Sequence, residues 1–528
     1  MSCLRAPRRA APSSLGTAFV FGLGALALAA CAPAAPAGTS APGPAAADTS
    51  ADSAASAGDS AGDAVPRLPS SERWRRHLDD DLLRFWLHPE ALGRTPGDFP
   101  TFRCNDGRVY RADAPCPELA EAPPWLSGEL GVEYTRMKSR QTFAYGVGFH
   151  ITGDPALLAH ARAGVDFLRR RAYEPTGTAV SYWKDGVAGP PADQRTTQDL
   201  AYAQVGLAFF YYLTRDPEVL ADLVRLEQHI FDRYWDPDAG MLRWVLAAGP
   251  GGEPDQQELV AQLDQINAYL LLVAPLITDP ATRERWLSHL HALSQIVRER
   301  FYAPAHNLFW GAVHAPERMR LGAHHTDFGH SAKSLWMLYL SARLADDHDQ
   351  GRFTKRAADA LIARAVTESG CWAAGVREDG ALDRFSNWWT AAELDQLAAT
   401  VALIDRTTAR YLAKSYDCWL ERFVDPGDHG VWPFVAPAGD GDEAEAGGPK
   451  VFHWKNGYHE FEHVLVALIT TAALRGEPLT LHYAFRERPA SELIQPYYFR
   501  ADIAAEAPLP LPGVDGLAGT SVTFTDLR

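Results

Sequence analysis

The sequence predicts an all-α protein built on an (α/α)6 barrel, which is a closed toroid of six helical hairpins. Apolar residues recur at three- and four-residue spacing from Ser70 onward, the period of helices that bury one face. Asp-Pro junctions between these helices recur at intervals of 62 and 63 residues, as expected for one hairpin per repeat. Neither end of the array has a clear polar capping repeat, and this favours closure into a ring over an open solenoid.

Twelve helical segments follow from this periodicity. They are expected at residues 71–87, 131–152, 154–174, 195–215, 216–236, 255–278, 279–302, 326–346, 352–369, 386–405, 407–425 and 455–476. Three junctions repeat one device, in which Asp caps the next helix and Pro takes its first position: Gly153-Asp154-Pro155, Arg215-Asp216-Pro217 and Thr278-Asp279-Pro280. Polar and aromatic residues gather on the even-numbered segments, so we expect these segments to form an inner ring around one pocket.

Residues 1–30 have the features of a bacterial lipoprotein signal peptide. Three arginines precede an apolar run at Ala18–Ala30, which is too short for a membrane-spanning helix. The motif Leu28-Ala29-Ala30-Cys31 resembles a lipobox, so Cys31 is expected to be lipidated and to become the mature N-terminus. Ala32 after it resembles the outer-membrane sorting pattern. We therefore expect an exported lipoprotein, anchored in the membrane through its lipid, on the outer membrane and facing the periplasm.

Composition changes divide the rest of the chain. Residues 31–65 are almost entirely Ala, Pro, Gly, Ser, Thr and Asp, which predicts a disordered tether after the lipidated cysteine. Residues 66–488 hold the helical periodicity and are expected to form the catalytic barrel. Residues 489–528 combine several prolines with short apolar pieces, and we expect a wrap over the barrel that ends in a frayed tail.

Four cysteines remain in the expected mature domain. Cys104 and Cys116 flank a turn-rich segment, which in an exported protein predicts a local disulfide. Cys371 and Cys418 are expected to be buried thiols. None of the four shows the spacing of a zinc site.

The charge balance and the aromatic content point to sugar and away from nucleic acid. The formal net charge is -16, whereas phosphate backbones require a basic face. The chain has 15 Trp residues, and indole surfaces suit sugar rings. We expect a small carbohydrate ligand and no nucleic-acid partner; composition does not define an oligomeric state.

The segment from Trp454 to His463 supports two interpretations that exclude each other. His459, Glu460 and His463 spell H-E-x-x-H, which on a helix places two imidazoles on one face for Zn²⁺ and a carboxylate beside them as general base. The extended continuation of such metallopeptidase motifs is absent. On an inner helix, His463 would lie one turn deeper than His459 and would bond a nearby Asp or Glu. The other interpretation is a sugar-site signature, W-K-x-x-Y-H, that ends at His459.

Five short motifs occur in a characteristic order on alternate helices. They are Ser139-Arg140, Gly329-His330, Trp388-Trp389 with Glu393, Asp425 to Gly430 with Trp432, and Trp454-Lys455 leading to Tyr458-His459. In these motifs, over roughly Ser70 to Arg488, the chain resembles the N-acylglucosamine 2-epimerase superfamily, which includes cellobiose 2-epimerases and mannose isomerases.

The resemblance implies epimerase or aldose–ketose isomerase chemistry without a metal or another cofactor. One histidine would remove the proton from C2 of the ring-opened sugar, and a second would return a proton to C2 or C1 of the cis-enediolate. By position His330 and His459 match this pair, and Arg140 matches the anion-stabilising arginine. Histidine suits the task because its ordinary pKa is near neutral, and a fixed cation suits a developing oxyanion. The resemblance does not separate the two reactions or identify the sugar.

The remaining expected substrate contacts lie on the same inner segments. They are Trp388, Trp389, Trp454, Glu393, Asp199, Asp264, Asn267, Tyr269 and Lys333. Of these, Trp389 and Trp454 match the family's stacking residues. Three residues after His330 the family usually has Glu, whereas this chain has Lys333, and a cation there would lower the pKa of His330. Asp264 and Asn267 stand near the place of the family's Asn and His pair, which has no clean match.

Three other functions stay open. A glycoside hydrolase or lyase on the same toroid would use two carboxylates, for which Asp199, Asp264 and Glu393 are candidates. A zinc metallopeptidase would use the H-E-x-x-H motif. A sugar-binding lipoprotein without catalysis is the third, and Lys333 is the feature that favours it.

Overall fold

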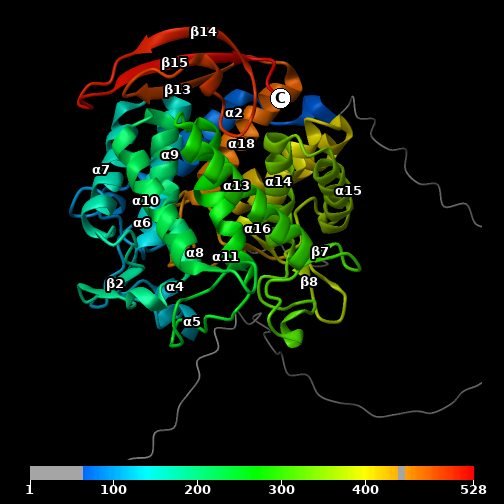
Figure 1. The fold of residues 1–528 in the computed structure, drawn as a ribbon. Coiled ribbons are helices and arrows are strands. Elements are labelled where there is room, and N and C mark those ends of the chain that lie inside the picture. The colour runs from blue at the N-terminus through cyan, green and yellow to red at the C-terminus, as the bar shows by residue number, and fades with distance from the viewer. Residues whose placement is uncertain (1–63, 438–445) are drawn as a thin grey trace, which may run out of the picture. The chain divides into compact units, whose positions relative to one another are not determined.

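Helices dominate the structure and form two layers (Figure 1). This computed structural model describes residues 64–437 and 446–528, all of which fall in one compact unit. The inner helices are α6 (Thr135–Thr152), α8 (Thr197–Tyr202) with α9 (Val205–Thr214), α11 (Leu259–Gln265) with η5 (Ile266–Leu270) and α12 (Leu271–Val273), α14 (Phe328–Ala345), α16 (Trp388–Ala402) and α18 (Tyr458–Arg475). Each inner segment contacts the next and α18 contacts α6, so the inner layer closes on itself.

The outer helices pack against this ring and bury one face each. They are α7 (Pro155–Arg171), α10 (Pro217–Tyr234), α13 (Pro280–Ile296), α15 (His348–Ala365), α17 (Ala409–Cys418) and α2 (Ser71–Arg76), which continues as η2 (His77–Leu83) and α3 (Arg84–Trp86). In α10 the buried apolar residues follow helical spacing, whereas in α6 every residue except the last is buried. This difference in burial is what separates an outer helix from an inner one.

The predicted Asp-Pro junctions start outer helices, as their chemistry requires. Asp154 accepts a hydrogen bond from the Ala156 amide, Asp216 from Glu218 and Asp279 from Thr282. In each case Pro occupies the first turn, where an amide proton would have no partner. A cap of this kind stabilises a helix by about 1 kcal/mol.

The C-terminal residues form a sheet, which is a correction to the all-α prediction. Strands β13 (Leu479–Phe485), β15 (Ala518–Thr525) and β14 (Asp502–Leu509) pair antiparallel in that spatial order. They lie across one end of the helices (Figure 1), where β13 contacts α6 and α9. The sequence predicted a frayed tail here, but its short apolar pieces alternate in burial along β15 and pair with β13, across the expected boundary at residue 488.

Hairpins occupy the opposite end. Short pairs such as β2 (Tyr182–Lys184) with β3 (Val187–Gly189), β6 (Tyr302–Ala303) with β7 (Leu308–Phe309), and β8 (Gly375–Val376) with β9 (Leu382–Asp383) connect outer helices to inner ones. In Figure 1 β2, β7 and β8 lie at the end away from the C-terminal sheet. Because inner helices alternate with outer helices along the chain, all inner helices begin at this end.

Two disulfides cross-link segments between or beside the helices. Cys104 and Cys116 are bonded, which confirms the predicted local disulfide. Cys371 and Cys418 are also bonded, so the prediction of two buried thiols was wrong. The two residues lie 47 positions apart, and only the packing of α17 against the turn after α15 brings them together.

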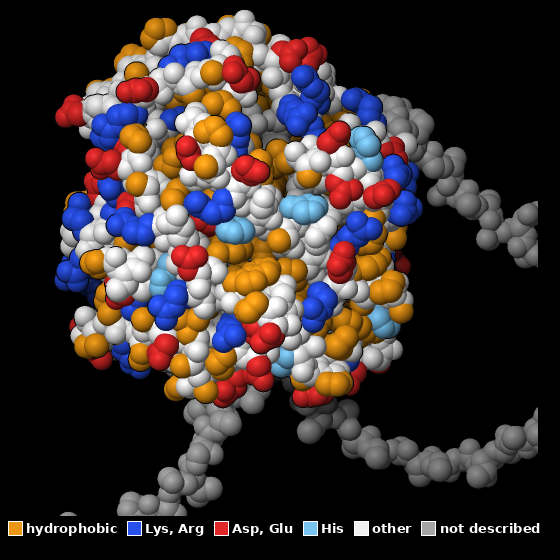
Figure 2. Space-filling view, viewed as in Figure 1, with side chains coloured by type: hydrophobic (Ala, Val, Ile, Leu, Met, Phe, Trp, Pro, Cys, Tyr) orange, Lys and Arg blue, Asp and Glu red, His pale blue; other side chains and the backbone are white. Residues whose placement is uncertain are grey.

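The expected signal peptide, the lipidation site at Cys31 and nearly all of the expected linker lie outside the described residues. Within the described part of the chain, Leu259–Leu276 has the length and mean hydropathy of a membrane span, but 94% of it is buried as the inner segment α11 to α12. On the face in Figure 2 acidic and basic side chains are interspersed, so this face offers no uniformly basic surface to nucleic acid.

Candidate functional site

The predicted site residues meet because each lies in the first two turns of an inner helix. Arg140 lies on α6, His330 on α14, Glu393 on α16 and His459 on α18, and all these helices begin at the end away from the C-terminal sheet. Their N-termini carry partial positive charge from aligned peptide dipoles. A negative charge that develops between them is therefore favoured.

His330 is held by the residue that caps its own helix. Asp327 accepts the backbone amide of His330 through Oδ1 at 2.8 Å and contacts the ring Nδ1 through Oδ2 at 2.7 Å. A carboxylate at Nδ1 holds the N–H there and leaves the lone pair on Nε2. Among the described residues Nε2 has no hydrogen-bond partner, so it is available to a ligand.

Trp389 lies close to both predicted catalytic histidines. Its ring centroid is 4.8 Å from that of His330 and 6.3 Å from that of His459. A Cβ built at Gly329 would lie 2.3 Å from the Trp389 ring, so only glycine lets the indole approach α14 beside His330. This explains the Gly-His pair in physical terms.

His459 is a neutral imidazole. Burial lowers its pKa well below 6.5, and the nearby cations Arg140 and Lys333 act in the same direction. Its Nδ1 lies 3.6 Å from Oε1 of Glu393. Nε2 has no hydrogen-bond partner in the described part of the chain, so His459, like His330, has a ring nitrogen free for proton transfer.

Glu393 is the protonated partner of His459. Burial raises its pKa to about 8, so at pH 7 the carboxyl group is mostly neutral. Oε2 accepts a hydrogen bond from Nε1 of Trp336 at 2.7 Å, and Oε1 is buried without a hydrogen-bond partner closer than His459. At pH 7 the carboxyl group of Glu393 therefore carries the proton beside a neutral His459.

Arg140 is a buried cation that has no ion pair with a carboxylate among the described residues. Its guanidinium lies 3.8 Å from the Tyr202 ring and donates to the carbonyl of Trp454 at 3.1 Å, while Nε has no partner among the described residues. Asp199, a carboxylate that could have paired with Arg140, is bonded to Arg136 instead, at 2.8 Å. Arg140 remains free to face an oxyanion.

Lys333 is paired with Asp264, whereas the sequence predicted that it would contact the substrate and act on His330. Its ammonium donates to Asp264 Oδ1 at 2.5 Å and to the Tyr202 hydroxyl at 3.0 Å, and Gln198 donates to the other Asp264 oxygen at 2.8 Å. Burial alone would lower the pKa of Lys333, but Asp264 raises it, and Lys333 in turn holds the pKa of Asp264 below its ordinary value despite burial. The counter-charge of His330 is Asp327, which the sequence interpretation missed although Asp-x-x-His at a helix start could have revealed it.

The other predicted contacts separate into two groups. Trp454 lies at the site, where it stacks on the Arg136 guanidinium at 3.8 Å, and Asn267 donates to the Tyr458 hydroxyl at 3.1 Å. Trp388 and Tyr269 have other ring partners, since Trp388 packs on Phe452 and Tyr269 packs on Trp286 of α13.

The residues of the H-E-x-x-H motif do not fit a zinc site. His463 bonds Asp395 at 2.8 Å, as its deeper position predicted, and stacks on Trp419. Glu460 accepts from Lys455 at 2.5 Å. Within residues 64–437 and 446–528, the potential ligand groups that come together are Cys104, Cys116 and Glu118, and those two cysteines form a disulfide.

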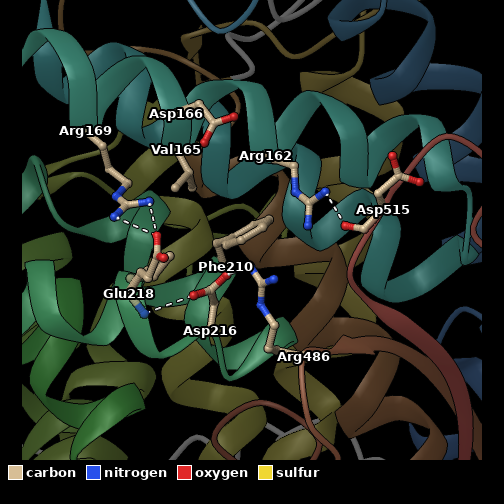
Figure 3. A pocket seen from close by; sticks show the side chains of 10 residues that line it. Arg162, Val165, Asp166, Arg169, Phe210, Asp216, Glu218, Arg486 and Asp515 are labelled. Carbon is tan, nitrogen blue, oxygen red and sulfur yellow. Dashed lines mark hydrogen bonds and ion pairs between the residues drawn. The ribbon is translucent and has the colours of Figure 1, made fainter.

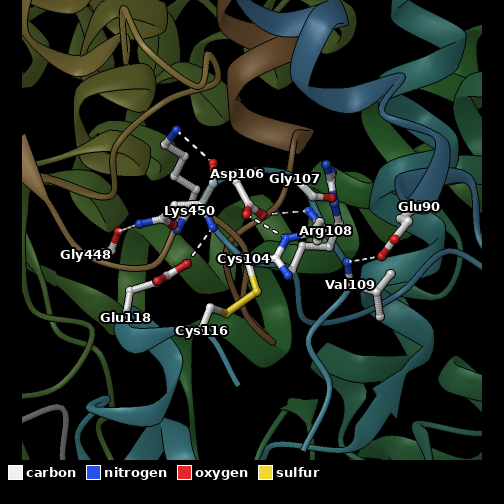
Figure 4. The surroundings of a disulfide bond; sticks show 12 residues. Glu90, Cys104, Asp106, Gly107, Arg108, Val109, Cys116, Glu118, Gly448 and Lys450 are labelled. Carbon is white, nitrogen blue, oxygen red and sulfur yellow. Dashed lines mark hydrogen bonds and ion pairs between the residues drawn. A yellow bond between two sulfur atoms is a disulfide. The ribbon is translucent and has the colours of Figure 1, made fainter. Parts of the chain in front are cut away.

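The disulfide loop supports the segment that carries Trp454. In Figure 4 the loop at Cys104–Cys116 meets Lys450, whose amide donates to Oδ1 of Asn105 at 2.8 Å. The Lys450 ammonium bonds Asp425, the first residue of the Asp-to-Gly motif noted in the sequence. That motif therefore anchors the segment leading to Trp454 and does not itself contact the histidines.

A shallow pocket of about 270 Å³ lies on the outside of the barrel between α7 and α10 (Figure 3). Its arginines bond within the protein, since Arg169 pairs with Glu218 and Asp222, Arg486 pairs with Asp216, and Arg162 donates to the carbonyl of Asp515. It has no contact with the histidines.

The chain is similar to known proteins in sequence and in fold. No family model matches the chain. In sequence it is similar to the cellobiose 2-epimerase of Eubacterium cellulosolvens, with 23% identity over 349 residues, which make up 61% of this chain and 84% of that protein. In structure it is similar to the cellobiose 2-epimerase of Spirochaeta thermophila, with a TM-score of 0.61, 19% identity, and coverage of 77% of this chain and 97% of the other. A D-mannose isomerase structure gives a TM-score of 0.61, 15% identity, and coverage of 76% and 98%.

These proteins are members of the N-acylglucosamine 2-epimerase superfamily, so the resemblance predicted from the sequence motifs is confirmed. The described residues have the same helix-rich fold as the solved structures.

Proposed function

We propose that this chain, which resembles the N-acylglucosamine 2-epimerase superfamily in sequence and fold, is a sugar 2-epimerase or aldose–ketose isomerase for a free mono- or oligosaccharide. The observation that carries the proposal is that His330 and His459 both lie beside Trp389, and that neither Nε2 has a hydrogen-bond partner among the described residues. An indole next to two bases is a platform on which one sugar ring can present C1 and C2 to both.

In the proposed reaction one imidazole takes the proton from C2 of the ring-opened sugar. The C2–H electron pair forms the C1–C2 double bond, and the carbonyl oxygen becomes the anion of a cis-enediolate. Return of a proton to the other face of C2 gives the epimer, and return to C1 gives the ketose. General acid–base catalysis of this kind contributes about 10²- to 10⁴-fold.

The surroundings suit each role. Asp327 would stabilise the imidazolium that forms when Nε2 of His330 takes a proton, and Glu393 would exchange its proton with Nδ1 of His459. Arg140 and the helix N-termini would stabilise the oxyanion. Trp454 would pack against the sugar, and no step requires a metal or another cofactor.

The catalytic unit of this proposal is the (α/α)6 barrel, carried by an exported lipoprotein on the outer membrane. Two disulfides support export, because structural disulfides persist in oxidising compartments. Lipidation at Cys31 belongs to the same proposal, and mass spectrometry of the mature N-terminus tests it: an unmodified Met1 would exclude it.

Hydrolysis by two carboxylates is less well supported. Glu393 has the raised pKa of a general acid. The other two predicted candidates are committed to cations, however, since Asp199 is paired with Arg136 and Asp264 with Lys333.

The proposal is tested with the full-length protein in D₂O, incubated with a panel of aldoses, ketoses and β-linked disaccharides and followed by NMR. Deuterium entering C2 or C1 is expected. New reducing ends without deuterium would point to hydrolysis, and sugar binding without either change would identify a barrel that only binds.

A further inference from the structure

Residues 495–498, between β13 and β14, contact the inner helices α9, α14 and α18. We propose that Tyr497, on this segment, is a positioning residue for His459 and acts through Glu462 and Glu393. The inference rests on the proposed function for its catalytic meaning, but its physical part, a link from Tyr497 to His459, can be measured without a substrate.

The segment is fixed in the barrel by tyrosine hydroxyls of the inner wall and the sheet. The carbonyl of Gln495 accepts from Tyr212 at 2.6 Å and from Tyr483 at 2.7 Å. The amide of Tyr497 donates to the Tyr212 hydroxyl at 2.8 Å. Tyr497 has a φ of 60°, a left-handed conformation that a residue with a side chain adopts only when its surroundings hold it there.

The segment touches both carboxyl groups behind His459. The Tyr497 hydroxyl donates to Oε1 of Glu462 at 2.6 Å in a fully buried position. The Tyr498 ring packs 5.6 Å from the Trp336 ring, whose Nε1 donates to Glu393. Glu393 in turn lies 3.6 Å from Nδ1 of His459. Contacts therefore lead from Tyr498 through Trp336 and Glu393 to the proposed base, while Tyr497 bonds Glu462, whose charge acts on Glu393.

The direction of the effect follows from the charges. Burial raises the pKa of Glu462, and the Tyr497 hydroxyl opposes this by stabilising the carboxylate. Burial raises the pKa of Glu393, and the charge of Glu462 acts in the same direction. A neutral Glu393 leaves His459 without an anion beside it, and this keeps the imidazole neutral and basic.

Other charged and titratable groups face this pair and are unchanged by the proposed substitution. They are Lys333 and Asp264 on α14 and α11, Arg140 on α6, Tyr458 on α18 and Tyr498 on the C-terminal segment. Their contribution to the pKa of His459 is the same with and without the Tyr497 hydroxyl.

The test is Tyr497→Phe in the full-length protein, with the ring of His459 followed by ¹⁵N NMR over pH. Loss of the hydroxyl favours protonated Glu462, then ionised Glu393, and so the imidazolium of His459. We expect the pKa of His459 to rise by about 0.5 to 1 unit and the acidic limb of kcat/KM to move with it. Tyr483→Phe is the matched control, because it removes a hydroxyl from the same cluster that touches only a backbone carbonyl and Tyr212.

An unchanged His459 titration in folded Tyr497→Phe would overturn the inference. If that variant does not fold, Glu462→Gln removes the same charge while keeping the shape, and it must shift His459 in the same direction. If the wild-type protein transfers no proton on any sugar, the proposed function fails, while the His459 titration still decides whether the link exists.

Discussion

His330 has a carboxylate beside it, but this carboxylate is not at the position that the family resemblance leads one to expect. Where the resemblance leads one to expect Glu three residues after the histidine, this chain has Lys333, which is neutralised by Asp264 from an adjacent inner segment. Asp327, three residues before the histidine, contacts its Nδ1. In this chain the carboxylate precedes the histidine by three residues, whereas in the family it follows the histidine by three.

Asp327→Asn is expected to lower kcat/KM by about 10²- to 10⁴-fold, because an amide cannot stabilise the imidazolium. Asn still caps α14, so the melting temperature should stay close to that of the wild type. Steady-state kinetics with thermal unfolding as the control separates the two effects. Unchanged kcat/KM would mean that Asp327 only caps the helix.

Glu393 also predicts a pH dependence of stability. Its pKa is about 8 in the folded protein and 4.5 ordinarily, so between these values the folded state holds a proton that the unfolded state has released. The stability from this group is complete below pH 4.5 and is lost as the pH rises through 8. Relative to Glu393→Gln, the wild-type free energy of unfolding should fall over this window in denaturant titrations, and parallel curves would contradict the assignment.

At the scale of elements, the two disulfides are expected to differ in function. The Cys104–Cys116 loop holds the segment that carries Trp454, whereas Cys371–Cys418 ties α17 to a turn on the outside of the barrel. Replacing the first pair by serines should raise KM about 3- to 10-fold, the loss of one aromatic contact with the sugar.

The same replacement of Cys371 and Cys418 is the matched control, and it should lower the melting temperature without changing KM. Equal KM values for both double variants would show that the first loop does not position Trp454.

At the scale of the whole molecule, local features were predictable and distant pairings were not. The Asp-Pro caps and the positions of His330 and His459 follow from a few neighbouring residues, and helical periodicity indicates a helix-rich fold. The Lys333–Asp264 pair joins residues 69 positions apart, and β13 pairs with β15 across a long intervening segment. Such contacts form only when the ring of helices closes, so they cannot be predicted from a local sequence pattern.

The measurement that tests the account most directly is the rate of deuterium incorporation into a turned-over sugar in D₂O. His330→Ala and His459→Ala are compared with the wild type and with His291→Ala, an exposed histidine on α13. The account predicts a loss of about 10²- to 10⁴-fold in both site variants and none in the control. Wild-type rates in a folded His459→Ala or His330→Ala protein would contradict it.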